Sequence, residues 1–176
     1  DKEELNKYRN KATKTADSIE IELFGNIGKP EDAKNVKDND GEGIGLFRTE
    51  FLFMENTQIP SEEEQFEAYK KTAVMMDGKE VIIRTLDVGG DKNIPYLGME
   101  KEDNPFLGFR AVRYCLDRKE MYKIQLRALI RASVFGKIKI MIPLVTCVNE
   151  LREVKALVED IKADLDRENI PYDKNI

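Results

Sequence analysis

Four short segments of branched and aromatic residues alternate with segments of helical periodicity, and this order restricts the fold more than any other feature of the chain. The predicted strands are residues 19–27, 43–54, 80–86 and 137–145. Alternation of strands and helices is typical of parallel strands with helices packed outside them. The sequence therefore predicts an α/β fold of about four βα units, which is either half of a (βα)8 (TIM) barrel or a small open sheet.

The helical segments carry their own boundary signals. They are residues 30–40, 61–76, 109–135 and 149–169. Pro30 suits the first position of the first helix. Ser61 and Glu64, three residues apart, predict a capping box at the start of the second helix. The third segment is predicted as two pieces broken near Asp117, whereas the last is a single amphipathic helix.

The two ends of the chain indicate how it is divided. Residues 1–17 are polar and rich in lysine and glutamate. Leu5, Tyr8 and Ala12 give this segment only a thin helical stripe, so we expect a connecting helix there. Residues 18–176 are expected to form the N-terminal half of the barrel. The chain stops where a further strand is due, and since an exposed parallel edge is a liability, we expect the barrel to be truncated.

Composition excludes several classes of function. The chain has 176 residues, a formal net charge of −5 and no histidine. An acidic chain does not offer a general nucleic-acid surface, although a local cluster of arginines can still bind a small anion. Without histidine there is no imidazole base, no imidazole metal ligand and no histidine to carry a phosphoryl group. No apolar run approaches the ~20 residues that a membrane-spanning helix needs, so we expect no membrane insertion.

The two cysteines, Cys115 and Cys147, are far apart and fit no metal or redox spacing. Together with the lack of a signal peptide, this indicates a reducing, cytoplasmic compartment. We expect Cys115 in the core of its helix and Cys147 near the surface at a helix start. Neither is a candidate nucleophile.

Arginines stand near the ends of the predicted strands, where the loops of a barrel form its working face. Arg48 lies well along the second strand, and Arg84 lies at the end of the third. The long segment 87–108 leaves from that same end, and Arg110 follows it. A guanidinium group presents a fixed fork of donors that suits phosphate and carboxylate. The pattern therefore indicates an anion site formed by two or three arginines on one rim.

The same arginines also have a purely structural interpretation. An arginine in a strand can pair with a neighbouring acid inside the barrel, and Glu50 and Asp87 are available. Spacing alone leaves both interpretations open. The two are compatible, because an acid beside a binding residue can hold it in place.

Five segments occur in order between residues 43 and 145: GIGLFRTEFLFM, PSEEEQFEAYK, RTLDVGGDK, NPFLGFRAVR and RALIRASVFGKIKIMIPLV. The resemblance that they carry runs from about residue 19 to the end of the chain. This ordered set resembles the phosphoenolpyruvate–protein phosphotransferases, the enzyme I family of the bacterial sugar phosphotransferase system. Pyruvate phosphate dikinase and phosphoenolpyruvate synthase share the RTE and NP-LG-R elements and form an alternative. The LDVGGDK segment looks like the enzyme I version rather than theirs.

The resemblance implies a phosphoenolpyruvate-binding (βα)8 barrel. In that family, phosphoenolpyruvate donates its phosphoryl group to a histidine on a separate N-terminal domain. That histidine passes it to a small histidine-containing phosphocarrier protein during sugar uptake, in a cytoplasmic enzyme expected to be a homodimer. By motif match, Arg48 and Arg84 would contact the substrate phosphate. Arg110 would be a further active-site arginine, and Asn104 would be a loop residue near it.

The chain also departs from the family pattern. The family's two acidic Mg²⁺ ligands, a second set of substrate contacts and its acid cysteine all come from later strands, and Cys115 and Cys147 do not match that cysteine. We therefore expect no metal site here, although the longer enzyme would need Mg²⁺, and we expect the chain to be catalytically inactive alone. The remaining alternative is an inert half-barrel that acts as a structural or dimerising module, because its open edges favour self-association.

Overall fold

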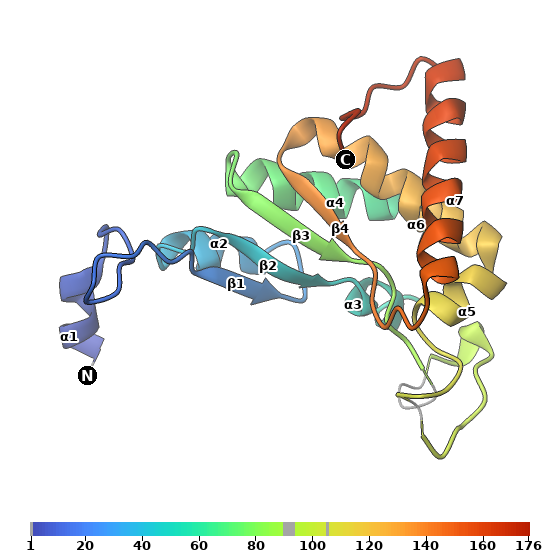
Figure 1. Cartoon of the computed structure of the whole chain (residues 1–176), viewed down its shortest axis with the longest axis horizontal. Helices are drawn as coiled ribbons and strands as arrows, with labels where there is room; N and C mark the ends of the chain where they lie inside the picture. Colours follow the sequence, from blue (N-terminus) through green and yellow to red (C-terminus); the bar gives the residue numbers. More distant parts are fainter. Residues whose placement is uncertain (1, 90–93, 105) are drawn as a thin grey trace.

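The computed structural model describes residues 2–89, 94–104 and 106–176. At its centre lies a parallel sheet in the order β1-β2-β3-β4 (Figure 1). The strands are β1 Phe24–Ile27, β2 Gly43–Arg48, β3 Glu80–Arg84 and β4 Ile138–Met141. Because all four strands are parallel, their carboxyl ends lie at the same edge of the sheet. The predicted α/β fold with four parallel strands is therefore confirmed.

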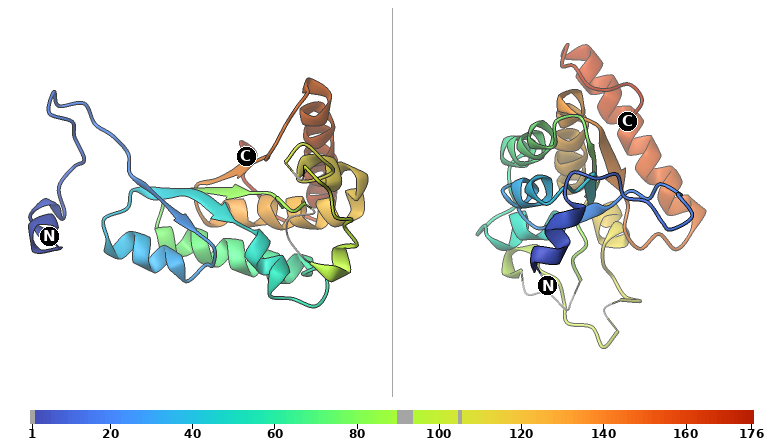
Figure 2. Two further views of the ribbon diagram at one scale, coloured as in Figure 1. Left: turned by 90° about the horizontal axis from the view of Figure 1, so that it is seen from below. Right: turned by 90° about the vertical axis from the view of Figure 1, so that its left-hand side faces the viewer.

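Seven helices are described. They are α1 Lys2–Leu5, α2 Asp32–Asp38, α3 Glu50–Met54, α4 Glu62–Met76, α5 Val112–Asp117, α6 Lys119–Ala132 and α7 Val148–Arg167, with 3-10 turns η1 at Asn6–Tyr8, η2 at Pro95–Leu97 and η3 at Ser133–Phe135. The helices α2, α4 and α6 all lie on the same side of the sheet (Figure 2). None of the described helices combines the length and the hydropathy that crossing a bilayer requires.

The main core lies between the sheet and these helices. Strand residues that point to this side are fully buried, and they pack against apolar side chains of α4 and α6. These residues include Ile44, Phe47, Val81, Ile83, Tyr69, Ala73, Leu129 and Ala132. The residues that alternate with them along the strands, such as Ile82, Arg84 and Lys139, are half-buried or exposed. One face of the sheet is therefore buried, and the opposite face is open.

A second core joins α5, α6 and α7 beyond the carboxyl ends of the strands. The helix α7 packs against both α5 and α6. Its apolar stripe contributes Val154, Ile161 and Leu165, and α6 contributes Tyr122 and Leu126. The amphipathic pattern of the last helix predicted this buried face correctly.

Two predicted helix boundaries are confirmed. Ser61 Oγ accepts a hydrogen bond from the backbone N–H of Glu64 at 3.2 Å, and Glu64 Oε2 accepts one from the backbone N–H of Ser61 at 2.7 Å. The capping box therefore starts α4 as expected. The break near Asp117 is also present, because α5 ends at that residue and α6 begins at Lys119.

The predicted second strand, residues 43–54, is wrong in its second half. β2 ends at Arg48, and residues 50–54 form the helix α3. Phe53 is buried from this helix, with 1% of its surface exposed, in the core that also holds Leu86 and Tyr122. A short apolar run satisfies either a strand or a buried helical turn, so its composition could not separate the two.

The N-terminal region also differs from the prediction. Of the described residues up to 17, only those of α1 and η1 are helical, whereas a helix was expected over residues 1–17. The first strand begins only at Phe24, not at residue 19. The preceding residues instead form a short hairpin, in which Thr15 N–H donates to Ile19 O at 2.9 Å and Ile21 N–H donates to Thr13 O at 3.0 Å. This segment leads away from the sheet, so little apolar surface is available to extend either element (Figure 1).

Smaller corrections concern the ends of other elements. The helix α2 begins at Asp32 with Glu31 as its N-cap, so Pro30 lies just before the helix rather than at its first position. The third and fourth strands are shorter than predicted and end at Arg84 and Met141. In both strands the residues beyond the ladder enter loops, which the apolar pattern alone did not reveal.

Candidate functional site

The carboxyl ends of β2 and β3 place two arginines next to each other. Arg48 is the last residue of β2, Arg84 is the last residue of β3, and their Cα atoms are partners in the parallel register. Their chain neighbours Phe47 and Ile83 point to the buried face. Because successive strand residues alternate between faces, both arginine side chains leave from the open face of the sheet.

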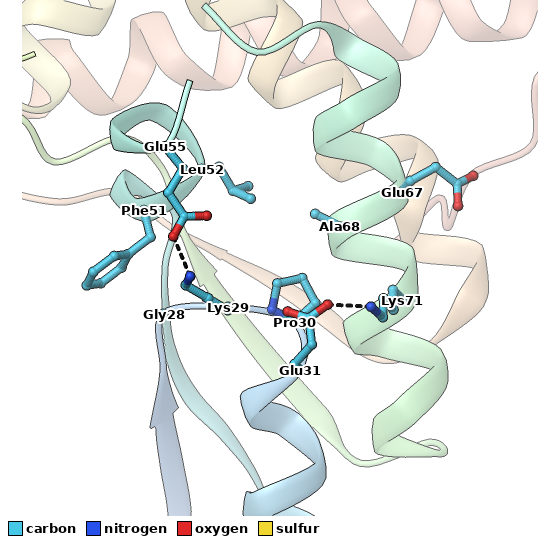
Figure 3. Close-up of a pocket in the computed structure, with 10 residues that line it drawn as sticks. All are labelled: Gly28, Lys29, Pro30, Glu31, Phe51, Leu52, Glu55, Glu67, Ala68 and Lys71. Carbon is cyan, nitrogen blue, oxygen red and sulfur yellow. Dashed lines mark hydrogen bonds and ion pairs between the residues drawn. The ribbon is translucent and has the colours of Figure 1, made fainter. Parts of the chain in front are cut away.

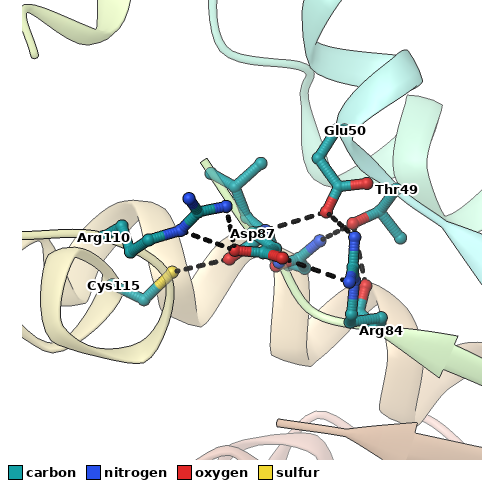
Figure 4. Close-up of polar contacts among 8 residues, drawn as sticks. Thr49, Glu50, Arg84, Asp87, Arg110 and Cys115 are labelled. Carbon is teal, nitrogen blue, oxygen red and sulfur yellow. Dashed lines mark hydrogen bonds and ion pairs between the residues drawn. The ribbon is translucent and has the colours of Figure 1, made fainter. Parts of the chain in front are cut away.

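Arg84 is held between two carboxylates. Its Nη2 donates to Glu50 Oε1 at 3.0 Å, and its Nη1 lies 3.1 Å from Asp87 Oδ2 (Figure 4). Glu50 Oε1 also accepts the backbone N–H of Asp87 at 3.0 Å. Glu50 is only 2% exposed, so these donors stabilise a carboxylate that has lost its contact with water. The structural interpretation of Arg84 as an ion-pair partner is therefore confirmed.

Arg110 approaches the same cluster from the other side. Its Nε and Nη2 donate to Asp87 Oδ1 at 3.1 and 2.9 Å, so Asp87 bridges the two arginines (Figure 4). The Arg110 guanidinium also lies over the ring of Phe106, 4.8 Å from its centroid. Only 2% of Arg110 is exposed. It is the most deeply placed of the three predicted arginines.

The backbone turns sharply just after Arg110. Ala111 has a φ of 50° and a ψ of −126°, a conformation that residues with a side chain rarely adopt. Its N–H donates to Val88 O at 3.2 Å, which ties this turn to the segment that follows β3. The turn starts α5 and directs Arg110 toward Asp87.

Arg48 differs from the other two arginines because its side chain is exposed. Its guanidinium lies over the ring of Phe51, 5.4 Å from the centroid. A contact with an aromatic face holds an arginine without neutralising its charge. Within the described ranges, Arg48 makes no ion pair with an acidic side chain. Its positive charge therefore stands beside the cluster without a carboxylate partner.

One donor of Arg84 is left over. Its Nε is buried and has no hydrogen-bond partner among the residues that the structure describes. A buried donor without an acceptor costs roughly 1–3 kcal/mol. The exposed charge of Arg48 and this buried donor lie at the same end of the sheet.

Behind the arginines, a chain of hydrogen bonds joins the strand ends to the helices. Thr49 Oγ1 donates to Arg84 O at 2.8 Å and accepts from Gln125 Nε2 at 3.2 Å. Gln125 Oε1 accepts the backbone N–H of Leu86 at 2.9 Å, and its Nε2 also donates to Tyr69 OH at 3.2 Å. Thr49, Gln125 and Tyr69 are all at least 99% buried. Burial raises the pKa of the Tyr69 hydroxyl, so it keeps its proton for this network.

The cysteines lie where the sequence predicts. Cys115 is fully buried on α5, and its Sγ donates to Leu86 O at 3.8 Å. Burial, with a smaller contribution from Asp87, raises the pKa of this thiol and keeps it protonated. Cys147 is exposed and stands just before α7.

Asn104 is exposed on the loop before Arg110, and its backbone oxygen accepts the N–H of Leu107 at 3.0 Å. Parts of the predicted long segment 87–108, namely 90–93 and 105, lie outside the described residues. The structure thus gathers Arg84 and Arg110 around Asp87, places Arg48 beside them, and leaves Asn104 on the surface of its loop.

A family model described as "PEP-utilising enzyme, PEP-binding domain" matches residues 2–176, which is nearly the whole chain. The chain belongs to this family. Phosphoenolpyruvate-protein phosphotransferases from three bacteria are similar to it. The protein from Staphylococcus carnosus (strain TM300) is 55% identical over 168 residues, which is 96% of this chain and 29% of the relative.

The relatives from Staphylococcus epidermidis and Priestia megaterium are similar to nearly the same extent. The first is 53% identical over 176 residues, covering 100% of this chain and 31% of the relative. The second is 51% identical over 175 residues, covering 99% of this chain and 30% of the relative. This member of the PEP-binding domain family therefore spans about 30% of the length of the curated relatives that it matches.

The described residues of this chain form no metal centre. Among them, no group of three or more histidine, cysteine, aspartate or glutamate side chains could hold a metal ion. The two acids at the rim, Glu50 and Asp87, are already engaged by guanidinium groups. The donor set described here therefore does not fit a divalent cation.

A separate pocket of about 430 Å³ lies between the turn after β1, the helix α3 and the helix α4 (Figure 3). Phe51, Leu52 and Ala68 form part of its wall. Ion pairs flank it, with Lys29 bound to Glu55 and Lys71 bound to Glu31. Because these charges already neutralise one another, the pocket is a weaker candidate for an anion site than the arginine rim.

The sequence analysis missed the polar network behind the rim. Gln125 gave a usable signal, because it is an amide on the helix face that also carries Tyr122, Leu126 and Leu129. A polar side chain on a buried stripe must find partners. Its partners come from segments 39 to 76 residues away, and a single sequence does not indicate such distant contacts.

Proposed function

We propose that this chain is the phosphoenolpyruvate-binding part of a phosphoenolpyruvate–protein phosphotransferase, and that Arg48 and Arg84 hold the phosphate of the substrate. One observation carries the proposal: the two arginines are register partners at the carboxyl ends of adjacent parallel strands, on the open face of the sheet. Functional groups of parallel α/β folds collect at that edge. The phosphotransferase names of the relatives support this proposal over a dikinase or synthase.

The chemistry of the rim suits a phosphoryl donor. A phosphate group offers several acceptor oxygens, and the guanidinium groups of Arg48 and Arg84 supply positive charge and donors at adjacent strand ends. Positioned cations stabilise a phosphoryl group as it is transferred. We assign Arg110 to the same site as a further arginine. Asn104, which lies on the preceding loop, is also assigned to this site. These four residues form the proposed substrate-binding group.

The proposal extends to the longer protein. A parallel sheet with helices on one face is what a sector of a (βα)8 barrel requires, and the arginines lie at the carboxyl ends of the strands, where barrel active sites are formed. We therefore assign residues 18–176 to the first half of such a barrel and residues 1–17 to a connecting segment. Mg²⁺ and its ligands, the phosphorylated histidine and the docking of the phosphocarrier protein are assigned to other parts of a cytoplasmic, homodimeric enzyme of sugar uptake. The chain alone is then inactive in phosphoryl transfer.

The ion pairs favour a second candidate function, in which the chain is a purely structural half-barrel. Glu50, Arg84 and Asp87 would make the same contacts in a purely structural half-barrel. In that case Arg84 contributes to stability alone, and removing it leaves the buried Glu50 without its guanidinium partner, whereas Asp87 keeps Arg110. Breaking a buried pair in this way costs about 3–5 kcal/mol.

Calorimetric titration of phosphoenolpyruvate into the chain, with and without Mg²⁺, tests the proposal. The variants are Arg48→Ala, Arg84→Ala and the matched control Arg131→Ala. Arg131 has the same side-chain exposure as Arg84, 18%, and pairs with two carboxylates, Glu62 and Glu63, away from the rim. Urea unfolding of each variant separates lost binding from lost stability.

The proposal expects Mg²⁺-independent binding that is lost in Arg48→Ala and Arg84→Ala and is kept in Arg131→Ala. Arg48 is the decisive position, because it makes no ion pair within the described residues and its removal should leave the fold intact. Binding that survives Arg48→Ala, or is absent from the unchanged chain, would contradict the phosphate site in this chain and leave the structural function.

A further inference from the structure

The distance between Arg48 and Arg84 depends on what holds the two strand ends together. The ladder between β2 and β3 ends at these residues, and its register is irregular between Ile44 and Phe47. The next link across the two strands is made by a side chain, because Thr49 Oγ1 donates to Arg84 O at 2.8 Å. Thr49 directly follows Arg48 in the chain. Its hydroxyl therefore ties the backbone beside one arginine to the backbone of the other.

Gln125 fixes this link to the rest of the fold. Its Nε2 donates to Thr49 Oγ1 at 3.2 Å, and its Oε1 accepts the N–H of Leu86, two residues after Arg84, at 2.9 Å. A single amide on α6 therefore holds both the segment that follows β2 and the segment that follows β3. Gln125 is 1% exposed and Thr49 is fully buried, so water does not compete for these contacts.

The direction of each hydrogen bond leaves little freedom. The Thr49 hydroxyl has one proton, and because that proton goes to Arg84 O, the oxygen must accept from Gln125. Gln125 must present its amide nitrogen to Thr49 and its oxygen to the N–H of Leu86. A glutamate at this position could not donate to Thr49, and an apolar residue could bond to neither strand end.

We propose that Thr49 and Gln125 are positioning residues, which set the spacing of Arg48 and Arg84 for the phosphate of the ligand. The inference rests on the proposed function of the two arginines and identifies the groups that pre-organise them. Neither residue needs to touch the ligand. Misplacing a group by about 1 Å can lower a reaction rate by up to a hundredfold, and we expect ligand binding to depend on position in the same way. Losing the tie should therefore weaken phosphate binding more than it weakens the fold.

Tyr69 provides the matched control. Its hydroxyl accepts from Gln125 Nε2 at 3.2 Å and donates to Gln65 Oε1 at 3.1 Å, so it belongs to the same buried network. It joins α6 to α4 and bonds to neither strand end. Tyr69→Phe therefore removes buried hydrogen bonds of the same kind without releasing the arginines.

The experiment compares Thr49→Val, Thr49→Ser, Gln125→Leu and Tyr69→Phe with the unchanged 176-residue chain. Three quantities are measured for each: the urea midpoint of unfolding, the dissociation constant of phosphoenolpyruvate, and the NMR signal of the Arg84 Nε–H group, which Arg84→Lys identifies by its disappearance. The NMR signal reports the position of Arg84 whether or not a ligand binds.

We expect Thr49→Val and Gln125→Leu to weaken binding about tenfold or more and to move the Arg84 Nε–H signal. Thr49→Ser should restore both, and Tyr69→Phe should lower the urea midpoint without changing either. If binding weakens in Tyr69→Phe as much as in Thr49→Val, or if Thr49→Val leaves binding unchanged, the positioning role is overturned.

Failure of the proposed function would be distinguishable from failure of this inference. If the unchanged chain binds no phosphoenolpyruvate, the phosphate site in this chain fails, and the NMR signal alone decides the positioning role. A signal that moves in Thr49→Val and Gln125→Leu but not in Tyr69→Phe supports it. An identical signal in all four variants overturns it.

Discussion

At Arg84, the guanidinium group uses Nη1 and Nη2 for two carboxylates and keeps Nε without a partner among the described residues. The pairing holds the side chain in one orientation, which lowers the conformational entropy that a ligand would otherwise have to remove. The ion pairs of Arg84 and its proposed contact with an anion are therefore compatible on one side chain.

Glu50→Gln should destabilise the fold at this point. The substitution keeps the shape but replaces the carboxylate that accepts from Arg84 Nη2 and from the backbone of Asp87. Hydrogen bonds to charged groups contribute about 1.5–3 kcal/mol, and the free energy of unfolding in urea should fall by that amount. Glu63→Gln, at an ion pair whose glutamate side chain is 64% exposed, should change it by less than about 1 kcal/mol. Equal effects in the two variants would contradict the buried role of Glu50.

Alkaline pH should destabilise the chain through three buried acids. Burial raises the pKa of Cys115, Tyr69 and Tyr122, so the folded state keeps protons that the unfolded state releases above its ordinary pKa values, about 8.5 for cysteine and 10 for tyrosine. Stability is unaffected below these values and falls as the pH rises through them. Each group contributes at most about 1.4 kcal/mol per pH unit.

Urea unfolding between about pH 8 and about pH 10.5 measures this slope. Tyr122→Phe removes one of the three protons and should make the slope shallower. Cys147→Ser is the control, because it also removes a thiol, but one that is exposed in the fold. A flat profile over this range would show that the three groups are not buried as described.

Among the elements, the ones with the clearest local signals were predicted best. The capping box of α4, the break after Asp117 and the apolar stripe of α7 follow from neighbouring residues, and the structure confirms all three. The segment 43–54 failed because Phe53 is buried by distant partners, which outweigh any local preference for a strand. At the site, the sequence identified Glu50 and Asp87 as partners for arginine but did not reveal Thr49 or Gln125.

Ser61→Ala should weaken the start of α4. The Ser61 hydroxyl accepts the backbone N–H of Glu64, and its loss should cost about 1 kcal/mol of unfolding free energy at neutral pH. Hydrogen bonds from Ser61 lower the pKa of Glu64, so the box is complete above the ordinary pKa of glutamate. It weakens as the pH falls through the lowered value. The difference between Ser61→Ala and the unchanged chain should therefore shrink in acid, and an undiminished difference would contradict this account.

On the scale of the whole molecule, the sheet has one buried and one open face, and the barrel proposal depends on that asymmetry. Ile82 and Ile83 are neighbours on β3 and point to opposite faces, the first half-buried and the second fully buried. In a barrel, the open face would become the interior once further strands close it. The exposed edge of β4 would gain a partner in the same step.

The pair Ile82→Ala and Ile83→Ala should measure the asymmetry directly. Ile83→Ala leaves a cavity under α4 and α6 and should cost about 2–5 kcal/mol of unfolding free energy. Ile82→Ala removes a side chain from the open face and should cost less than half as much in this chain. Urea unfolding of both variants provides the comparison. Similar losses would show that a second layer already covers the open face and would argue against the barrel.

The turn at Ala111 affects both the stability of the fold and the orientation of Arg110, and it affects them in opposite directions. Its backbone angles are those of a position that favours glycine, the first central residue of a type II′ turn, and holding a side chain there costs of order 1–3 kcal/mol. Ala111→Gly should therefore raise the melting temperature, measured by circular dichroism, whereas Ala111→Val should lower it. Alanine has less backbone freedom than glycine, so at this position it should keep the Arg110 side chain directed toward Asp87. Ala111→Gly should then raise stability and at the same time loosen the contact between Arg110 and Asp87, so one substitution would change the two properties in opposite directions.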